Sequence, residues 1–307
     1  MLQGIFPVIP TMFTPAGALD RQAQNSVVRF ALAAGADGVV YPGVASEYSF
    51  LSGEECGELI ALVVDVVGGQ VPVIGGASAQ SAKESIALGR AAMSHGIEQL
   101  MIMAPASLGD DVSKHQSFFS DVASGLPGCE IILQNAPSPI GAGLAPEAIV
   151  EIVRANQAIR YIKEETLPSG PRITAMLADA IPHLQGIFGG GGARYIVDEF
   201  RRGSIGALPA VELTDLHAAI YRAHQDGDDN RMRRLYQLSL PLLTSQAIYR
   251  MRLTKYILQQ RGVADATLVR APLPDLDSMA KRDVETMLDD LRNANAFEWT
   301  EAITWTK

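Results

Sequence analysis

A lysine, Lys163, stands at the end of a short apolar run, and two carboxylates, Glu164 and Glu165, follow it directly. A lysine amine at the end of a buried strand is desolvated, which lowers its pKa and frees it to attack a carbonyl carbon and form a Schiff base. Glu165 comes two positions later, so in an extended strand it points to the same side as Lys163 and can act as acid or base beside an imine. A plain ion pair between the lysine and a neighbouring glutamate would also explain this segment.

Short apolar runs recur through the first 209 residues, and longer helical stretches separate them. Each run is nearly continuous in apolar residues, and most are bounded by Gly or Pro, as expected of parallel strands covered on both faces. The runs cover residues 4–10, 38–43, 71–76, 99–105, 130–135, 159–163, 184–189 and 205–209. Eight such units predict an α/β fold, a (β/α)8 TIM barrel, in which active sites lie at the C-terminal ends of the strands. Lys163 is at such an end.

Helix boundaries can also be predicted. Ser52 and Glu55 have the spacing of a capping box that opens a helix through Val67, and Pro146 suits the first turn of a helix that runs to Ala155.

Beyond residue 209 the strand pattern stops, and residues 212–293 indicate helices with breaks at Gly227, Gly262 and the Pro272/Pro274 turn. We therefore expect the barrel and its active site in residues 1–224. A C-terminal helical extension packed on the barrel is expected in residues 225–307.

Composition narrows the class of partner. The 307 residues are 48% hydrophobic and carry a net charge of −9 without a Lys/Arg-rich block, which argues against nucleic acid or an anionic membrane and favours a small molecule. The longest apolar segment, residues 59–67, is interrupted by Asp65 and is shorter than the ~20 residues that span a bilayer. Two cysteines, Cys56 and Cys129, and the absence of a basic start before a long apolar run favour the cytoplasm.

No metal or other cofactor is expected. The five histidines show no pairing with Asp or Glu at metal-ligand spacing, and we expect them at the surface. They are His95, His115, His183, His217 and His224.

Three segments resemble the class I, Schiff-base family that contains dihydrodipicolinate synthase and N-acetylneuraminate lyase. Residues 43–55 (GVASEYSFLSGEE) resemble the family's Gly-Thr-Thr-Gly-Glu element and the helix start after it, residues 134–138 (QNAPS) stand where the family has Tyr-Asn-x-Pro-Ser, and residues 161–164 (YIKE) match its Schiff-base lysine segment. The resemblance covers nearly the whole chain. It implies a barrel with C-terminal helices, Lys163 as the imine-forming residue, a small 2-keto acid as substrate and a homotetramer.

The departures from the family pattern are informative. Gln134 stands in place of the proton-shuttle tyrosine, Val44 and Ala45 in place of a threonine pair, residues 105–107 (PAS) in place of Pro-Tyr-Tyr, and Pro139 in place of an arginine that holds a carboxylate in the synthases. These changes argue against dihydrodipicolinate synthesis. A neutral amide cannot relay protons as a phenol can, so retro-aldol cleavage is also weakened.

Glu165 is the expected substitute for the missing tyrosine. Gln134, expected to contact the substrate, and the Lys-x-Glu pattern together resemble the branch of the family that dehydrates 2-keto-3-deoxy sugar acids, notably 2-keto-3-deoxy-L-arabonate dehydratase. The resemblance implies loss of water from this acid, with 2-oxoglutarate semialdehyde as product. Lys163 would form the imine at the C2 ketone, and Glu165 would take the C3 proton and protonate the departing C4 hydroxyl.

Other site residues have weaker support. Ser46, with backbone N–H groups of its loop, is expected to bind the substrate carboxylate, although a role in the turn alone also fits. Gly189 and Gly190 are expected to leave room for the substrate tail. Glu47 is interpreted as an organiser of the site, and Asn135 as a brace of the loop around it or a simple turn residue.

Two other functions remain open. The first is a pyruvate-dependent aldolase or lyase on a related 2-keto acid, with Glu165 or a bound water substituting for the tyrosine. The second is a non-catalytic keto-acid binding protein on the same barrel, in which Lys163 would not react with borohydride in the presence of substrate.

Overall fold

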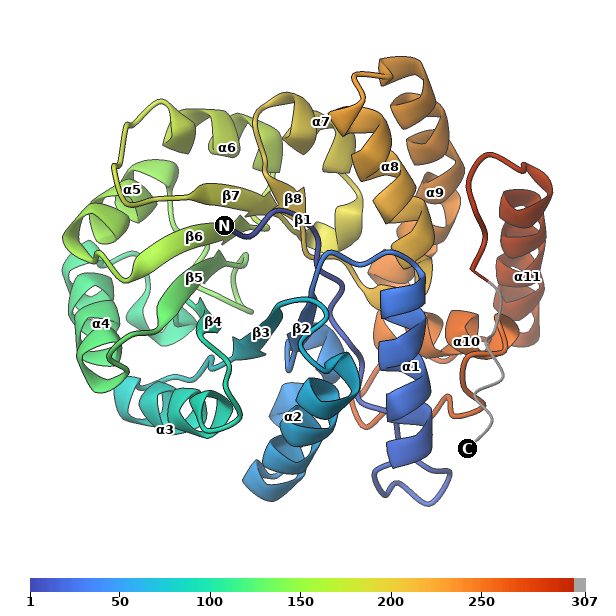
Figure 1. Cartoon of the computed structure of the whole chain (residues 1–307), viewed down its shortest axis with the longest axis horizontal. Helices are drawn as coiled ribbons and strands as arrows, with labels where there is room; N and C mark the ends of the chain where they lie inside the picture. Colours follow the sequence, from blue (N-terminus) through green and yellow to red (C-terminus); the bar gives the residue numbers. More distant parts are fainter. Residues whose placement is uncertain (301–307) are drawn as a thin grey trace. The chain divides into compact units, whose positions relative to one another are not determined.

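A computed structural model describes residues 1–300 of the chain (Figure 1). Eight strands occur in this part of the chain, and each falls within or overlaps one of the eight apolar runs, so the strand prediction is confirmed. The strands are β1 (Gly4–Ile5), β2 (Val39–Tyr41), β3 (Val73–Gly76), β4 (Gln99–Met103), β5 (Glu130–Asn135), β6 (Ile159–Glu164), β7 (Gly186–Gly189) and β8 (Gly206–Ala207).

Helices alternate with these strands and continue after the last one. They are α1 (Arg21–Ala33), α2 (Gly53–Val67), α3 (Ala82–Met93), α4 (Val112–Gly125), α5 (Pro146–Ala155), α6 (Ser169–Leu177), α7 (Ile196–Arg201), α8 (Thr214–Gln225), α9 (Asp229–Tyr249), α10 (Met251–Gln260) and α11 (Ser278–Asn293). This is the element order of a (β/α)8 TIM barrel followed by a C-terminal helical extension, and the predicted fold class is confirmed.

The predicted helix starts are also confirmed. Glu55 N donates to Ser52 Oγ at 3.1 Å and Ser52 N donates to a Glu55 carboxylate oxygen at 2.9 Å, which is the reciprocal pattern of a capping box. Pro146 is the first residue of α5, where its missing N–H is not needed.

The chain divides into two compact units, which are described separately. The first contains Met1–Gln3, Val73–Gly191 and Tyr195–Leu208, and the second contains Gly4–Pro72, Gly192–Arg194 and the chain from Pro209 onward. The predicted division into a barrel at residues 1–224 and an extension at residues 225–307 follows the order of strands and helices, whereas the two units are defined by contacts. The predicted division therefore remains a prediction.

The first unit holds six parallel strands, β3 to β8, each paired with the next along the chain. Helices α3 to α6 lie along the outer side of these strands (Figure 1). The strand interiors are apolar and fully buried, as at Ile132, Leu133, Ile162 and Ile187, because residues of both orientations are covered. In register, Gln134 of β5 lies beside Lys163 of β6.

In its described residues the second unit holds β1, β2 and the six α-helices α1, α2 and α8 to α11. Val8 forms parallel bridges to Val40 and to Ala210. Helix α9 packs against α8, α10 and α11. The breaks predicted near Gly227 and Gly262 are present, but one more separates α9 from α10 at Arg250, where φ is +50°. Arginine carries no sequence mark of a left-handed residue, so this break was not predicted.

The expectation that all five histidines lie at the surface is wrong for two of them. His115 is fully buried on the apolar face of α4, and its Nε2 lies 3.0 Å from the carbonyl oxygen of Gly109. His217 is 1% exposed within α8, and burial lowers its pKa to about 4. In the part of the chain that the structure describes, no helix is long and apolar enough to cross a membrane.

Candidate active site

Lys163 lies at the carboxyl end of β6 and is 4% exposed. Its Nζ is 3.0 Å from a carboxylate oxygen, Oε1, of Glu165. The two side chains share one side of the extended strand because side-chain direction alternates with period two. The ammonium and the carboxylate therefore form an ion pair at the edge where barrel active sites lie.

Both carboxylate oxygens of Glu165 are held. Gln134 Nε2, from the neighbouring strand, donates to Oε2 at 2.7 Å, and Gly191 N donates to Oε1 at 3.4 Å. Burial would raise the pKa of Glu165, but the Lys163 charge and the hydrogen bonds from Gln134, Lys163 and Gly191 outweigh it, so the pKa lies below its ordinary value. Glu165 is therefore an ionised carboxylate at neutral pH.

Gln134 is 1% exposed and lies in register with Lys163. Its amide donates a hydrogen bond to Glu165 and orients this carboxylate toward the lysine. An amide has no proton to lose at neutral pH, so it can hold the acid–base group without replacing it.

Glu164 points to the opposite side of β6 and is fully buried. Asn135 Nδ2 donates to its two carboxylate oxygens at 3.1 and 3.0 Å, Thr166 N donates to Oε1 at 2.6 Å, and Arg172 Nε lies 3.3 Å from Oε2. Burial raises the pKa of Glu164, while Arg172 and these hydrogen bonds oppose the rise. Of the two glutamates that could pair with Lys163, the nearer in sequence is thus turned away from it.

Asn135 also ties the following loop to the strand. Its Oδ1 accepts from Leu144 N at 2.9 Å, and its Nδ2 donates to Leu144 O at 3.1 Å. The side chain is fully buried, so these bonds and those to Glu164 are shielded from water. They fix the chain that follows β5 next to the end of β6.

Gly189 and Gly190 were predicted to leave room for a substrate. In the structure, the space beside each of them holds a glutamate side chain of the protein itself. A Cβ on Gly190 would lie 2.2 Å from Glu165 Cγ, and a Cβ on Gly189 would lie 2.0 Å from Glu199 Oε2. Any side chain at either position would therefore displace one of these glutamates. The role of the two glycines toward a substrate remains a prediction.

Glu199 is a buried carboxyl that sequence reasoning missed. It is 1% exposed on α7, and Ser169 Oγ of α6 donates to its Oε1 at 2.7 Å. Burial raises its pKa to about 7, and the negative charges of Asp198, Glu165 and Glu164 act in the same direction. An acidic residue inside the short apolar stretch after the glycines was the available indication.

Ser46 and Glu47 belong to the second unit, and the hydrogen bonds of their side chains are made within that unit. Ser46 is fully buried; its Oγ donates to Ile9 O at 2.5 Å and accepts from Gly43 N at 2.9 Å. The hydroxyl hydrogen thus serves the turn, and the expected contact with a substrate carboxylate remains a prediction.

Glu47 connects its loop to the C-terminal helical region. It has a left-handed backbone, with φ of +58°, and its Oε1 accepts from Lys255 Nζ at 2.7 Å. Its Oε2 accepts from the backbone N–H groups of Arg270 and Ala271 at 2.7 and 2.8 Å. Burial lowers the pKa of Lys255 to about 8, although Glu47 opposes this shift. Sequence reasoning missed Lys255, which is 208 residues from Glu47.

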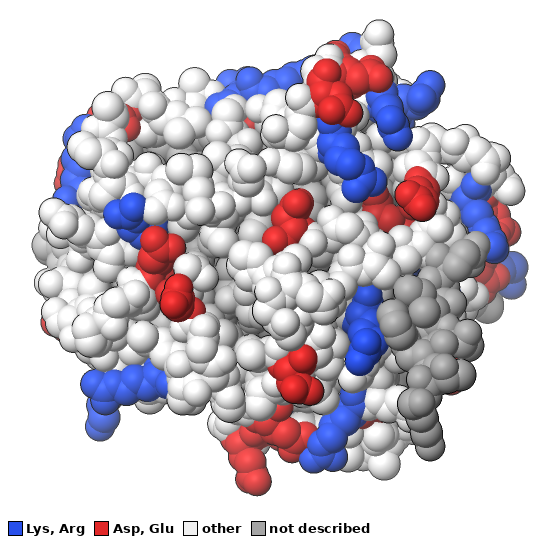
Figure 2. All heavy atoms as spheres, in the orientation of Figure 1, with Lys and Arg blue, Asp and Glu red and all other residues white. Residues whose placement is uncertain are grey.

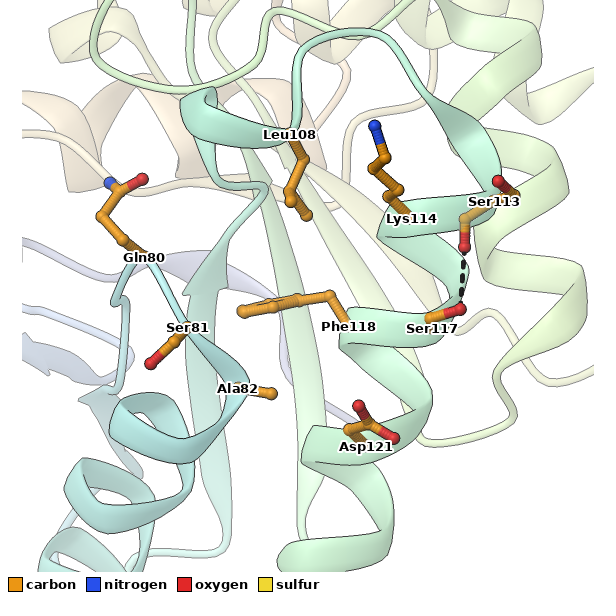
Figure 3. Close-up of a pocket in the computed structure, with 9 residues that line it drawn as sticks. All are labelled: Gln80, Ser81, Ala82, Leu108, Ser113, Lys114, Ser117, Phe118 and Asp121. Atoms are coloured by element: carbon orange, nitrogen blue, oxygen red, sulfur yellow. Dashed lines mark hydrogen bonds between the residues drawn. The ribbon is translucent and has the colours of Figure 1, made fainter.

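A groove of about 370 Å³ lies elsewhere in the first unit, between the start of α3 and the first turns of α4. It is lined by Ser81, Leu108, Lys114 and Phe118 among others (Figure 3). None of the predicted site residues lines it. On the face shown in Figure 2, acidic and basic side chains are interspersed and do not gather in one basic patch.

A family model, described as the dihydrodipicolinate synthetase family, matches residues 1–291 of the chain. The chain belongs to this family. Members are lyases that use a Schiff-base mechanism on small keto acids, and the Lys163 segment is the one that resembles the family's imine-forming lysine. Among the described residues, no group of three or more His, Cys, Asp or Glu side chains could hold a metal ion.

Curated relatives in the family differ in the reaction that their names give. An L-2-keto-3-deoxyarabonate dehydratase from Azospirillum brasilense is 27% identical over 278 residues, which covers 89% of each chain. A probable 2-dehydro-3-deoxy-D-pentonate aldolase from Escherichia coli strain K12 is 26% identical over 294 residues, covering 93% of this chain and 96% of the relative.

Solved structures in the family share the fold. The 4-hydroxy-tetrahydrodipicolinate synthase of Methylacidiphilum fumariolicum SolV matches with a TM-score of 0.87 and 23% identity over 96% of this chain and 98% of its own. The Escherichia coli K12 protein YagE, solved in complex with pyruvate, matches with a TM-score of 0.86 and 23% identity over 95% of this chain and 99% of its own.

The expected role of Lys163 in forming an imine can be tested directly. Incubation with pyruvate and borohydride should reduce the imine and leave a covalent adduct on Lys163, identified by peptide mass spectrometry. Lys163→Ala should give no adduct, whereas Lys114→Ala, which removes an exposed lysine of α4, should be trapped as the unmodified protein is. Adduct on another lysine would rule out Lys163 as the imine-forming residue.

The Glu47–Lys255 pair should contribute strongly to stability. Lys255→Met keeps the length of the side chain but leaves a buried carboxylate without its cation, so the free energy of unfolding should fall by ~3–5 kcal/mol in urea titrations. Arg154→Met is the matched control, because the Arg154–Asp179 pair is about half exposed, and its loss should cost ~1 kcal/mol or less. Equal losses for the two variants would contradict the importance of the buried pair.

Proposed function

We propose that this protein dehydrates a 2-keto-3-deoxy sugar acid through a Schiff base on Lys163, with 2-keto-3-deoxy-L-arabonate as the substrate and 2-oxoglutarate semialdehyde as the product. The observation that carries the proposal is the 3.0 Å pair between Lys163 and Glu165, with Gln134 in the position of the family's tyrosine. The similarity to the dehydratase of Azospirillum brasilense supports the choice of substrate.

The first step is attack of the Lys163 amine on the C2 ketone. Glu165, as the carboxylate next to the ammonium, can accept the proton that the amine must lose before it attacks. Addition gives a carbinolamine; Glu165 returns the proton to the carbinolamine hydroxyl, which leaves as water, so that the protonated imine forms and Glu165 is again ionised. The iminium then withdraws electrons from C3 and makes the C3–H bond acidic.

Elimination needs one base and one acid in succession, and Glu165 can serve as both. As the carboxylate it takes the C3 proton and the electron pair moves into an enamine; as the acid it then protonates the departing C4 hydroxyl while the C3–C4 double bond forms. Glu165 ends the step ionised, as it began. Tautomerisation of the unsaturated imine and its hydrolysis release the aldehyde and restore the Lys163 amine, so one water is lost overall.

Aldol cleavage is the second candidate, because a similar relative is named as a probable aldolase of a deoxypentonate. Cleavage of the C3–C4 bond requires a base for the C4 hydroxyl proton, and Gln134 cannot supply it. Glu165 is the one group of the Lys163–Glu165–Gln134 set that could. Dehydration additionally uses Glu165 at C3, which is two bonds from the imine nitrogen, so the 3.0 Å distance between Glu165 and Lys163 Nζ supports dehydration.

Other parts of the proposal rest on resemblance. Ser46 and the N–H groups of its loop would bind the substrate carboxylate, and Gly189 and Gly190 would face its tail with their backbone groups. Glu47 and Asn135 would hold the loops of the site in place. A homotetramer in the cytoplasm completes the proposal.

A product screen separates the two reactions. The protein is incubated with a panel of 2-keto-3-deoxy acids of five and six carbons, and the products are measured by mass spectrometry. Dehydration predicts loss of one water and no pyruvate, with the five-carbon L-arabonate derivative turned over fastest. Release of pyruvate faster than loss of water would establish the aldolase instead.

The proton transfer by Glu165 has its own test. Glu165→Gln keeps the size of the side chain but removes the base, so dehydration and exchange of the C3 hydrogen with deuterium oxide should each fall by ~10²-fold or more. Trapping by borohydride, allowed to go to completion, should still label Lys163. Unchanged C3 exchange would mean that Glu165 serves only as the counter-ion of Lys163.

The unmodified protein should also lack an acid limb near neutrality. Glu165 acts as a carboxylate, and its pKa lies below the ordinary 4.5. Protonation should therefore reduce the rate only below about pH 4.5, measured as the pH dependence of kcat/KM.

A further inference from the structure

A buried carboxyl beside β7 has no part in the proposed chemistry. Glu199 accepts one hydrogen bond, from Ser169 Oγ to Oε1 at 2.7 Å. Its other oxygen, Oε2, is also buried, and within the described part of the chain no group is hydrogen-bonded to it. A neutral carboxyl tolerates such a position far better than a carboxylate, because an unpaired buried charge is much more costly than an unpaired polar atom.

The carboxyl of Glu199 occupies the space that a side chain at Gly189 would need. A Cβ at that position would lie 2.0 Å from Oε2 and 2.6 Å from Cδ. Gly189 pairs in register with Glu164 of β6, and the next residue, Gly190, makes room for Glu165. The two glycines at the end of β7 thus each leave room for one glutamate, Gly189 for Glu199 and Gly190 for Glu165.

The charges around Glu199 favour its protonated form. The charged groups on the elements around it are Arg160 near the start of β6, Lys163, Glu164 and Glu165 at its C-terminal end, Arg172 on α6, and Asp198, Arg201 and Arg202 on and after α7. Lys163 is paired with Glu165, Arg172 with Glu164, and Arg202 with Asp198. After burial, the charges that raise the pKa of Glu199, to about 7, are Asp198, Glu165 and Glu164.

We propose that Glu199 is a proton-dependent positioning residue: its neutral carboxyl packs beside Gly189 and leaves the Lys163–Glu165 pair intact, and its ionisation disables that pair. Gly189 and Glu199 lie on the Glu164 side of the strands, so the coupling to the pair runs through the end of β7. An ionised Glu199 would be a buried charge without a cation, which strains the packing at Gly189. A displacement there would move Gly190, which packs on Glu165, and Gly191, whose N–H donates to Glu165 Oε1. The proposal rests on the proposed function only in needing the imine at Lys163.

The direction of the pH effect follows from the two states of the chain. An unfolded Glu199 loses its proton near pH 4.5, whereas the folded one keeps it to about pH 7. Its contribution to folding stability is therefore full below pH 4.5, declines as the pH rises to about 7, and is constant above that. The fraction of folded protein that has a neutral Glu199, and can therefore form the imine, falls as the pH rises through about 7.

Glu199→Gln tests the proposal, because glutamine copies the neutral carboxyl and cannot ionise. The readout is the rate at which pyruvate is trapped on Lys163 by cyanoborohydride between pH 6 and pH 8. The ratio of the variant's rate to that of the unmodified protein should rise ~10-fold from pH 6 to pH 8, since a group with a pKa near 7 is about nine-tenths ionised at pH 8. The exposed Glu151→Gln should keep a constant ratio.

Ser169→Ala gives a second measure that does not alter Glu199 itself. The Ser169 hydroxyl lowers the pKa of Glu199, so its removal should raise that pKa and move the decline of trapping to higher pH. A purely structural role of Glu199 would change the rate by the same factor at every pH. A constant ratio for Glu199→Gln, together with an unshifted decline for Ser169→Ala, would overturn the proposal.

Infrared spectroscopy separates this inference from the proposed function. The C=O stretch of a neutral carboxyl should appear in the difference spectrum between the unmodified protein and Glu199→Gln at pH 6 and should vanish by pH 8. Its absence at pH 6 would overturn the inference. Failure of pyruvate trapping in the unmodified protein at all pH values would overturn the Schiff base, while the band would still report whether Glu199 holds its proton.

Discussion

The ion pair between Lys163 and Glu165 depends on one geometric constraint, the alternation of side chains along β6. Because the strand is extended, residues 163 and 165 share a side, and Glu164 between them is turned to the other. Each side then recruits its own partner from β5, Gln134 for Glu165 and Asn135 for Glu164. A shift of one residue in the register between β5 and β6 would exchange these partners and take Gln134 away from Glu165.

Three buried carboxyl groups around the ends of β6 and β7 are accommodated in three different ways. Glu165 is balanced by the lysine, and Glu164 by Arg172 with amide and backbone donors. Glu199 has a hydroxyl donor, and its pKa near 7 lets it remain neutral. The three carboxyl groups differ accordingly in pKa: that of Glu165 is lowered by the lysine, that of Glu164 is raised by burial against the effect of Arg172, and that of Glu199 is raised by burial to about 7.

The sequence alone was enough for features that depend on local pattern. Apolar runs located all eight strands, the Ser52–Glu55 spacing located a helix start, and period two placed Glu165 beside Lys163. Features that depend on contacts between distant segments were not accessible. Lys255 reaches Glu47 across 208 residues, and Glu199 accepts a hydrogen bond from Ser169 across 30 residues. Burial of histidines on mixed helix faces is decided by packing in the same way.

The contact between Gly189 and Glu199 also restricts how this part of the chain can change. A side chain at position 189 is possible only if residue 199 becomes shorter or turns away, because the two compete for one volume. The effects of substitutions at the two positions should therefore not add. Related chains that carry alanine or serine at the position of Gly189 are expected to have a smaller residue at that of Glu199, so the pair should vary together.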